Sequence, residues 1–101
     1  MNIMQMMKQA QNLQTKMKAT QEELANIEVS GEAGSGAVTV TFDGQGKFKA
    51  IKLSSEATGL DTETLEDVIT TAMNQASAKA SKIMEEKMKA LTGGINIPGL
   101  F

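Results

Sequence analysis

The sequence predicts an α+β protein in which three short strands lie between two long helices. Residues 1–27 follow a helical repeat, residues 28–53 alternate with a period of two, and a second helical repeat runs through residues 61–92. A chain of 101 residues has the usual size of one domain with a single core. We therefore expect residues 1–101 to form a single domain.

The first predicted helix covers residues 1–27. Its apolar and weakly polar side chains recur at alternating intervals of three and four residues, which is the repeat of a helix that packs along one seam. These positions are Ile3, Met6, Ala10, Leu13, Met17, Thr20, Leu24 and Ile27. No glycine or proline interrupts the repeat, so the helix would be about 37 Å long.

Residues 28–53 predict an antiparallel meander of three strands. The strand segments read EVSGEA, AVTVTF and KFKAIKL, and the sequences GSG and DGQG between them supply the glycines that tight hairpins need. In the second segment Val38, Val40 and Phe42 share one face. We expect this face to be buried and the opposite face to meet solvent or a partner.

The third strand departs from strict alternation. Phe48 is out of phase with Ile51 and Leu53, because residues on one face of a strand are separated by an even number of positions. A bulge near Lys49 and Ala50 would restore a common face. We therefore predict a bulge in this strand.

The second predicted helix covers residues 61–92. Asp61 is a candidate N-cap, and Leu60 with Leu65 would form a hydrophobic staple around it. Apolar side chains then keep a helical period for about 30 residues, or about 45 Å, at Leu65, Ile69, Ala72, Ala76, Ala80, Met84, Met88 and Leu91. Glycines end this repeat, and we expect residues 93–101 to form a flexible tail.

The lengths of the helices predict a homodimer. Strands of about 20 Å cannot cover both helices, so the helices must project beyond the sheet and leave an apolar stripe in water. A second copy would cover that stripe, and the small residues between Ala72 and Ser81 would let another backbone approach closely. The side chains expected to contact a second copy or another partner are Met6, Met7, Leu13, Met17, Ala76, Ala80, Met84 and Met88.

The methionine-rich start MNIMQMMK could be a membrane foot, a part of the core or a contact surface. Polar residues interrupt it, and the chain contains no run of about 18 apolar residues, so neither a signal peptide nor a membrane segment is expected. If the two helices run antiparallel, Met4, Met6 and Met7 would lie near Met84 and Met88. We then expect adaptable contacts with a second arm or a protein partner at the tips.

Positive charge is concentrated on the two predicted helices, although the net charge is −2. Residues 1–21 hold three lysines and no acidic residue, residues 22–67 hold ten acidic residues and three lysines, and residues 68–101 hold four lysines and two acidic residues. Such segregation is typical of a surface that meets a polyanion. The candidate DNA phosphate contacts are Lys8, Lys16, Lys18, Lys79, Lys82, Lys87 and Lys89. The same lysines are also compatible with an ordinary solvated helix face.

The missing residue types restrict the chemistry. The chain has no arginine, histidine, cysteine, tryptophan or tyrosine. Without a guanidinium group it cannot read guanine bidentately, and without exposed aromatic rings it offers no stacking platform to single strands. DNA contacts are therefore expected to be mainly with phosphates. The lack of cysteine fits a reducing cytosol.

No catalytic, metal-binding or cofactor-binding motif emerges. GEAGSG lacks the lysine and following helix of a phosphate-binding loop, and DGQG lacks the alternating oxygen ligands of a calcium loop. Glu63, Glu66 and Asp67 are explained by the favourable interaction of negative charge with a helix start. We expect neither an enzyme nor a cofactor-dependent protein.

Four stretches are distinctive in combination, and they occur in the order MMKQAQNLQTKM, EELANIEVSGEAGSGAVTVTFDGQG, LEDVITTAMNQASAKA and LTGGINIPGLF. Together they resemble the YbaB/EbfC family of bacterial nucleoid-associated proteins. The resemblance implies a two-layer α-β-β-β-α protomer and an intertwined homodimer whose paired helices project like tweezers and straddle DNA. It also implies a cytoplasmic, nucleoid-associated location, and it transfers no catalytic or metal-binding residue.

Two hypotheses about function remain open. In the first, the protein is a homodimer that binds double-stranded DNA with little sequence preference, organises the chromosome and modulates transcription. In the second, it is a protein-interaction module whose Met-rich arms grip a partner, with weak or no DNA binding. The segregated lysines favour the first hypothesis, and the negative net charge with the apolar tips favours the second.

Overall fold

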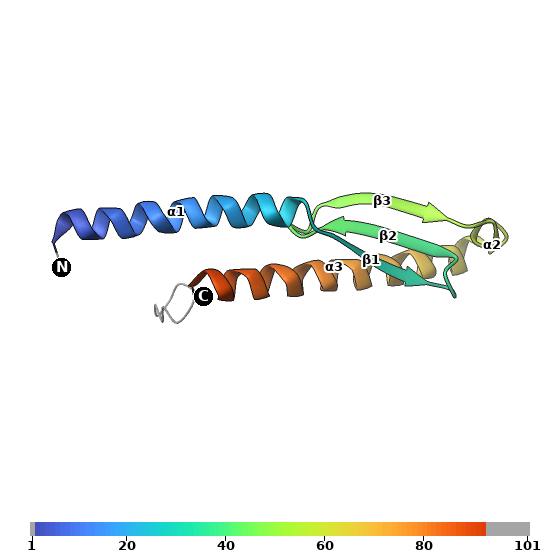
Figure 1. The fold of residues 1–101 in the computed structure, drawn as a ribbon. Helices are drawn as coiled ribbons and strands as arrows, with labels where there is room; N and C mark the ends of the chain where they lie inside the picture. The colour runs from blue at the N-terminus through green and yellow to red at the C-terminus, as the bar shows by residue number, and fades with distance from the viewer. Residues whose placement is uncertain (1, 93–101) are drawn as a thin grey trace.

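Two long helices and a three-stranded sheet form an elongated molecule, in the computed structural model that describes residues 2–92 (Figure 1). The elements are α1 (Ile3–Ala25), β1 (Glu28–Ala33), β2 (Val38–Asp43), β3 (Phe48–Leu53), α2 (Ser55–Thr58) and α3 (Thr62–Thr92). This order confirms the predicted α-β-β-β-α arrangement. The short helix α2 was not predicted, and the expected tail, residues 93–101, lies outside the described residues.

Both long helices begin after a residue with a capping side chain. Asn2 accepts a hydrogen bond from the backbone N–H of Gln5 at 2.9 Å and caps α1. Asp61 precedes α3, and hydrogen bonds from the hydroxyl and the backbone N–H of Thr64 hold the pKa of its carboxyl below the usual value. The carbonyl oxygen of Asp61 also accepts a hydrogen bond from the backbone N–H of Leu65 at 2.9 Å, so Asp61 occupies the predicted N-cap position and α3 begins one residue later.

The sheet has the order β1-β2-β3, and both strand pairs are antiparallel. Val38, Val40 and Phe42 of β2 are buried, as their alternation predicts. Between β2 and β3 the register shifts next to Phe42, which pairs with Phe48, so that Lys49 is the extra residue of a bulge. The predicted bulge is confirmed.

Helix α3 lies against one face of β1 and β2 because its packing surface consists of small side chains (Figure 1). Ala72, Ala76 and Ala80 are completely or almost completely buried there. A Cβ atom on Gly31 of β1 would lie 2.2 Å from the Ala72 carbonyl oxygen and 2.6 Å from the Ala76 nitrogen. The predicted close approach therefore occurs within one chain.

This packing corrects two expected contacts with a second copy. Ala76 and Ala80 have exposed fractions of 0% and 1%, because the chain's own sheet covers them. Small size predicts that a backbone comes close, but it does not predict which backbone. Neither side chain is accessible to a partner.

The outer edge of β1 is closed by two long side chains of α3. Lys79 Nζ donates to the carbonyl oxygen of Ser30 at 2.7 Å, and the backbone N–H of Glu32 donates to Gln75 Oε1 at 3.2 Å. These contacts satisfy edge groups that could otherwise pair with another strand. Lys79 therefore has a structural partner within the chain.

The turn between β2 and β3 holds the end of α1. The N–H of Gly44 donates to the carbonyl oxygens of Leu24 at 2.9 Å and Ile27 at 3.0 Å, and Gln45 Nε2 donates to the carbonyl oxygen of Gln21 at 2.9 Å. Buried Asp43 shapes the turn by accepting two backbone hydrogen bonds through Oδ1, each at 2.9 Å. The interpretation of DGQG as a hairpin turn is confirmed.

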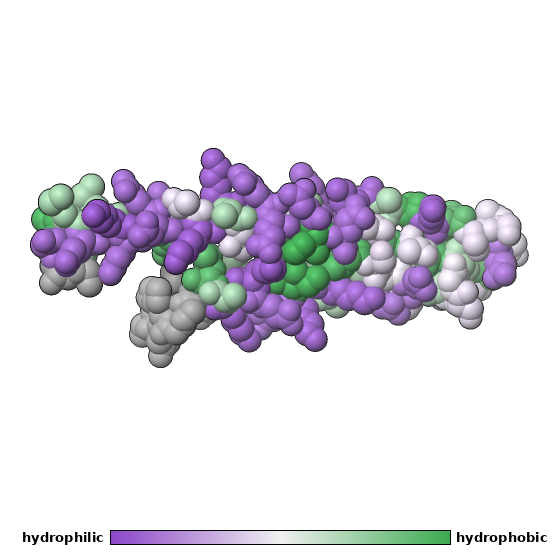
Figure 2. Space-filling model, viewed as in Figure 1, coloured by the Kyte–Doolittle hydropathy of each residue, from purple (hydrophilic) through white to green (hydrophobic). Residues whose placement is uncertain are grey.

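Three apolar side chains of β3 share the covered face of the sheet but lie beyond the reach of α3. We call them the β3 face. They are Phe48, Ile51 and Leu53, with exposed fractions of 50%, 42% and 45%. Their cross-strand partners on β2 are buried, so the sheet is covered over two strands and open over the third. Figure 2 shows hydrophobic surface over β3.

A second apolar surface runs along α1, which projects from the sheet with little packing against it. We call it the α1 stripe. Its members are Ile3, Met6, Ala10, Leu13 and Met17, of which all but Leu13 are exposed. The free end of α1 is also hydrophobic in Figure 2. The isolated chain thus leaves two apolar surfaces without a partner in the described residues.

We predict that Gly31→Ala destabilises the fold by about 2 kcal/mol or more, because the new methyl group would overlap the α3 backbone. Thermal or urea unfolding followed by circular dichroism measures the change. The matched control is Gly59→Ala, whose Cβ would lie 3.6 Å from the Glu56 carbonyl oxygen at an ordinary helical φ of −86°. It should leave the stability unchanged or slightly higher, and equal losses in both variants would contradict the packing described here.

Candidate nucleic-acid interface

Helix α1 and the last third of α3 run side by side in opposite directions (Figure 1). A cross-helix ion pair joins Lys87 Nζ to Glu23 Oε1. The two side chains are 37% and 53% exposed, so the pair contributes at most about 1 kcal/mol to stability. It aligns the two helices without holding them rigidly.

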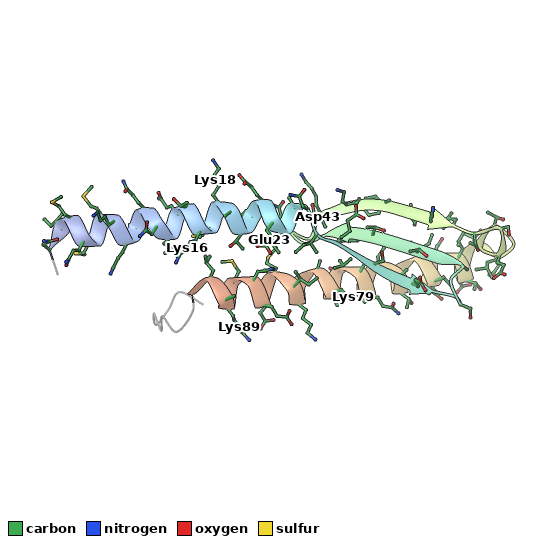
Figure 3. The ribbon with its side chains drawn as sticks, in the orientation of Figure 1. Lys16, Lys18, Glu23, Asp43, Lys79 and Lys89 are labelled. Carbon is green, nitrogen blue, oxygen red and sulfur yellow. The ribbon has the colours of Figure 1, made fainter. Side chains whose placement is uncertain are left out.

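An open groove of about 400 Å³ lies between these helices. It is lined by Lys16, Ala19, Thr20, Glu23, Lys87, Ala90 and Leu91. In Figure 3, Lys16 and Glu23 lie on the side of α1 that is turned toward α3. Two ammonium groups and a hydroxyl can donate hydrogen bonds there, while the alanines and the leucine provide an apolar surface. This is a donor set for an anionic oxygen.

The groove face and the α1 stripe are neighbouring faces of the same helix, and they meet at Thr20, which continues the repeat of the stripe and also lines the groove. Lys16, Thr20 and Glu23 follow the i, i+4, i+7 spacing of one face. Met17 comes one residue after Lys16 and is therefore turned by about 100° around the helix axis. Contact with α3 consequently leaves most of the stripe uncovered, with Leu13 as its half-buried member.

The seven lysines predicted as phosphate contacts do not all meet in one place. The structure brings Lys16 and Lys87 together at the groove. Lys18 points away from α3, and Lys89 lies on the far side of α3 (Figure 3), where it pairs with Glu85 at 3.4 Å. The ammonium group of Lys79 donates a hydrogen bond to the edge of β1.

The remaining two candidates are Lys8 and Lys82. Both are exposed, Lys8 on the projecting part of α1 and Lys82 on the middle of α3. One chain therefore presents its positive charge along both sides of the helix pair. At the groove, one lysine of each helix contributes to the same lining.

The expected meeting of methionines at the tips is wrong for a single chain. The methionines concerned are Met4, Met6 and Met7 of α1 and Met84 and Met88 of α3. Met7 precedes Glu23 by about 16 residues, or about 24 Å of helix, whereas α3 continues for only about 8 Å beyond Lys87. The start of α1 therefore projects past the end of α3, and its methionines are exposed.

Sequence reasoning missed the roles of Glu23 and Gln75. Glu22 and Glu23 are the only acidic residues of α1. Their position on an otherwise basic helix was the one feature of the sequence that could have indicated a role for Glu23. Its pairing with Lys87 depends on the relative positions of two distant segments. Gln75 gave no signal, because a polar residue on an exposed helix face needs no partner.

Acidic side chains do not converge on a metal site in the described part of the chain. Glu63, Glu66 and Asp67 are exposed near the start of α3, where the helix dipole favours negative charge. Within residues 2–92, no helix is both long and apolar enough to span a bilayer.

Comparison with known proteins agrees with a nucleic-acid interface. The profile of the YbaB/EbfC DNA-binding family matches residues 1–95. A nucleoid-associated protein of Rhodospirillum rubrum is 47% identical over 98 residues, covering 96% of this chain and 92% of that protein. A nucleoid-associated protein of Afipia carboxidovorans is 48% identical over 96 residues, covering 94% of this chain and 91% of that protein.

The fold also matches a solved structure. An uncharacterized protein of Helicobacter pylori superposes with a TM-score of 0.85 over 92% of this chain and 99% of that chain, at 16% identity. At this identity the likeness concerns the fold alone. From the profile match and the relatives, we conclude that the chain belongs to the YbaB/EbfC DNA-binding family.

Proposed function

We propose that this nucleoid-associated protein acts as a homodimer that binds double-stranded DNA through its phosphates. It contacts many sequences with similar affinity, organises the chromosome in the cytoplasm and thereby modulates transcription. The observation that carries this function is the projecting helix α1, whose lysines lie along a free arm and at the groove with α3. Family membership supports DNA as the ligand.

The two uncovered apolar surfaces support the homodimer. The β3 face and the α1 stripe together expose large side chains that a stable monomer would cover. In a twofold dimer each copy offers both surfaces to the other, so both can be buried at once. The partner's arm then lies near the first arm, and the lysines of two chains surround one space.

The composition supports contact with phosphates. All ten basic side chains are lysines, which present compact charges without the planar fork that reads base edges. Such contacts give affinity that depends strongly on salt and weakly on sequence. Phosphate binding of this kind suits a protein that acts at many chromosomal sites.

A second candidate function is docking to a protein through the arm tips. Ile3, Met4, Met6 and Met7 are 57–75% exposed beyond the end of α3, and methionine adapts to varied apolar surfaces. A chain that binds no duplex even at low salt would leave this function as the better account.

We predict that Ile51→Lys converts the homodimer to a monomer, because the charge would enter the apolar contact at the β3 face. Sedimentation equilibrium should give about twice the 10.7 kDa chain mass for the native protein and about 10.7 kDa for the variant. The control is Ala50→Lys, which adds the same charge on the other face of β3, where Ala50 pairs with Thr41 of β2. This variant should remain dimeric. A native protein with the mass of one chain would contradict the dimer.

We predict that replacing Lys8, Lys16 and Lys18 together by glutamine weakens DNA binding and flattens its salt dependence. Log affinity falls as log salt rises, and each lost phosphate contact makes this slope shallower by about 0.9. A dimer loses the three lysines on both of its chains, so its slope should become shallower by several units. Fluorescence anisotropy with two unrelated duplexes at about 50–300 mM salt measures both quantities.

The matched control removes the same charge elsewhere, by changing Lys47, Lys49 and Lys52 of the hairpin and β3 to glutamine. It should keep most of the affinity and the slope. Equal losses in the two triple variants would indicate a general charge effect and would contradict phosphate binding by the lysines of α1. No binding of either duplex at low salt would refute DNA binding by this chain.

A further inference from the structure

We propose that the groove between α1 and α3 is a phosphate site that the carboxylate of Glu23 occupies in the unbound protein. DNA would displace this carboxylate from Lys87, so Glu23 acts as an internal competitor that limits affinity. This role rests on the DNA binding proposed above, and it concerns how tightly the arms hold a duplex rather than whether they do.

The contacts in the groove already resemble phosphate recognition. Lys87 Nζ holds an anionic oxygen, supplied by Glu23, and Lys16 and Thr20 line the same groove with further donors. A phosphodiester presents the same chemistry, a singly charged group with two anionic oxygens. It could take over the bond to Lys87 and also reach Lys16.

The exchange is easy because both partners are exposed. Glu23 keeps a half-exposed side chain, so it can turn into solvent without leaving a buried charge. The released carboxylate nevertheless stays on the groove wall, where it repels the incoming phosphate. Two unit charges about 5 Å apart in water change an equilibrium about fourfold.

Glu22 provides a matched control one position earlier. It has the same charge and belongs to the same exposed turn of α1, but it does not line the groove. Neutralising either residue changes the net charge of the chain equally. Only the neutralisation of Glu23 also releases Lys87.

The test compares Glu23→Gln, Glu22→Gln and the double variant Glu23→Gln/Lys87→Gln by fluorescence anisotropy on one duplex over a range of salt. We expect Glu23→Gln to bind about fourfold more tightly or better at low salt, with a slope steeper by about 0.9 for each released lysine. Glu22→Gln should gain less than half of this factor and keep the native slope. The double variant should lose the gain.

Equal gains from Glu22→Gln and Glu23→Gln, or a gain that survives loss of Lys87, would overturn the competitor role while leaving DNA binding in place. A native protein that binds no duplex at all would instead refute the proposed function. Because the pair is exposed, all variants should unfold at nearly the native temperature. If Glu23→Gln does not fold, Glu23→Asp replaces it, since its shorter side chain keeps the charge but should release Lys87 and steepen the slope; an unchanged slope would overturn the role.

Discussion

The contact between the backbone of α3 and Gly31 is the constraint on which the rest of the architecture depends. Any side chain at Gly31 would collide with α3, and the alanines of α3 have no bulk that could hold the helix away from the sheet. The helix therefore lies close over β1 and β2 and leaves β3 uncovered. Its remaining length must continue past the sheet, where it meets α1. The open β3 face and the helical arms thus have one cause.

The hairpin between β2 and β3 supplies the second fixed point. Asp43 holds the turn in shape, and Gly44 lies so close to Leu24 that a Cβ atom would be 2.7 Å from its carbonyl oxygen. The end of α1 is therefore anchored to the same sheet that positions α3. With both helices fixed at the sheet, the groove and the ion pair between Glu23 and Lys87 follow from helix geometry. Within residues 2–92, the free end of α1 projects beyond the sheet and beyond α3 (Figure 1), which suits a surface that binds a second copy or a ligand.

The sequence predicted features that depend on local periodicity, and it failed where the position of one segment relative to another matters. The helices, the meander and the bulge at Lys49 follow from repeats of 3.6 and two residues. The axial offset that separates the methionines of α1 from those of α3 does not, because periodicity defines a face but not a height along the axis. For the same reason, seven lysines were equivalent in the sequence, whereas the fold uses Lys79 to close β1 and Lys87 to pair with Glu23. The small residues of α3 correctly predicted that another backbone comes close, but they could not identify β1 as that neighbour.

The proposed function requires that two copies hold a duplex between their α1 arms. The chain has no native cysteine, so a single Gln9→Cys variant places one spin label on each arm at an exposed position. Double electron–electron resonance then reports the distance between the two labels of a dimer. We expect a dipolar signal without DNA and a narrower distance distribution when a duplex is bound. Absence of a dipolar signal, or a distribution that a bound duplex leaves unchanged, would contradict this arrangement.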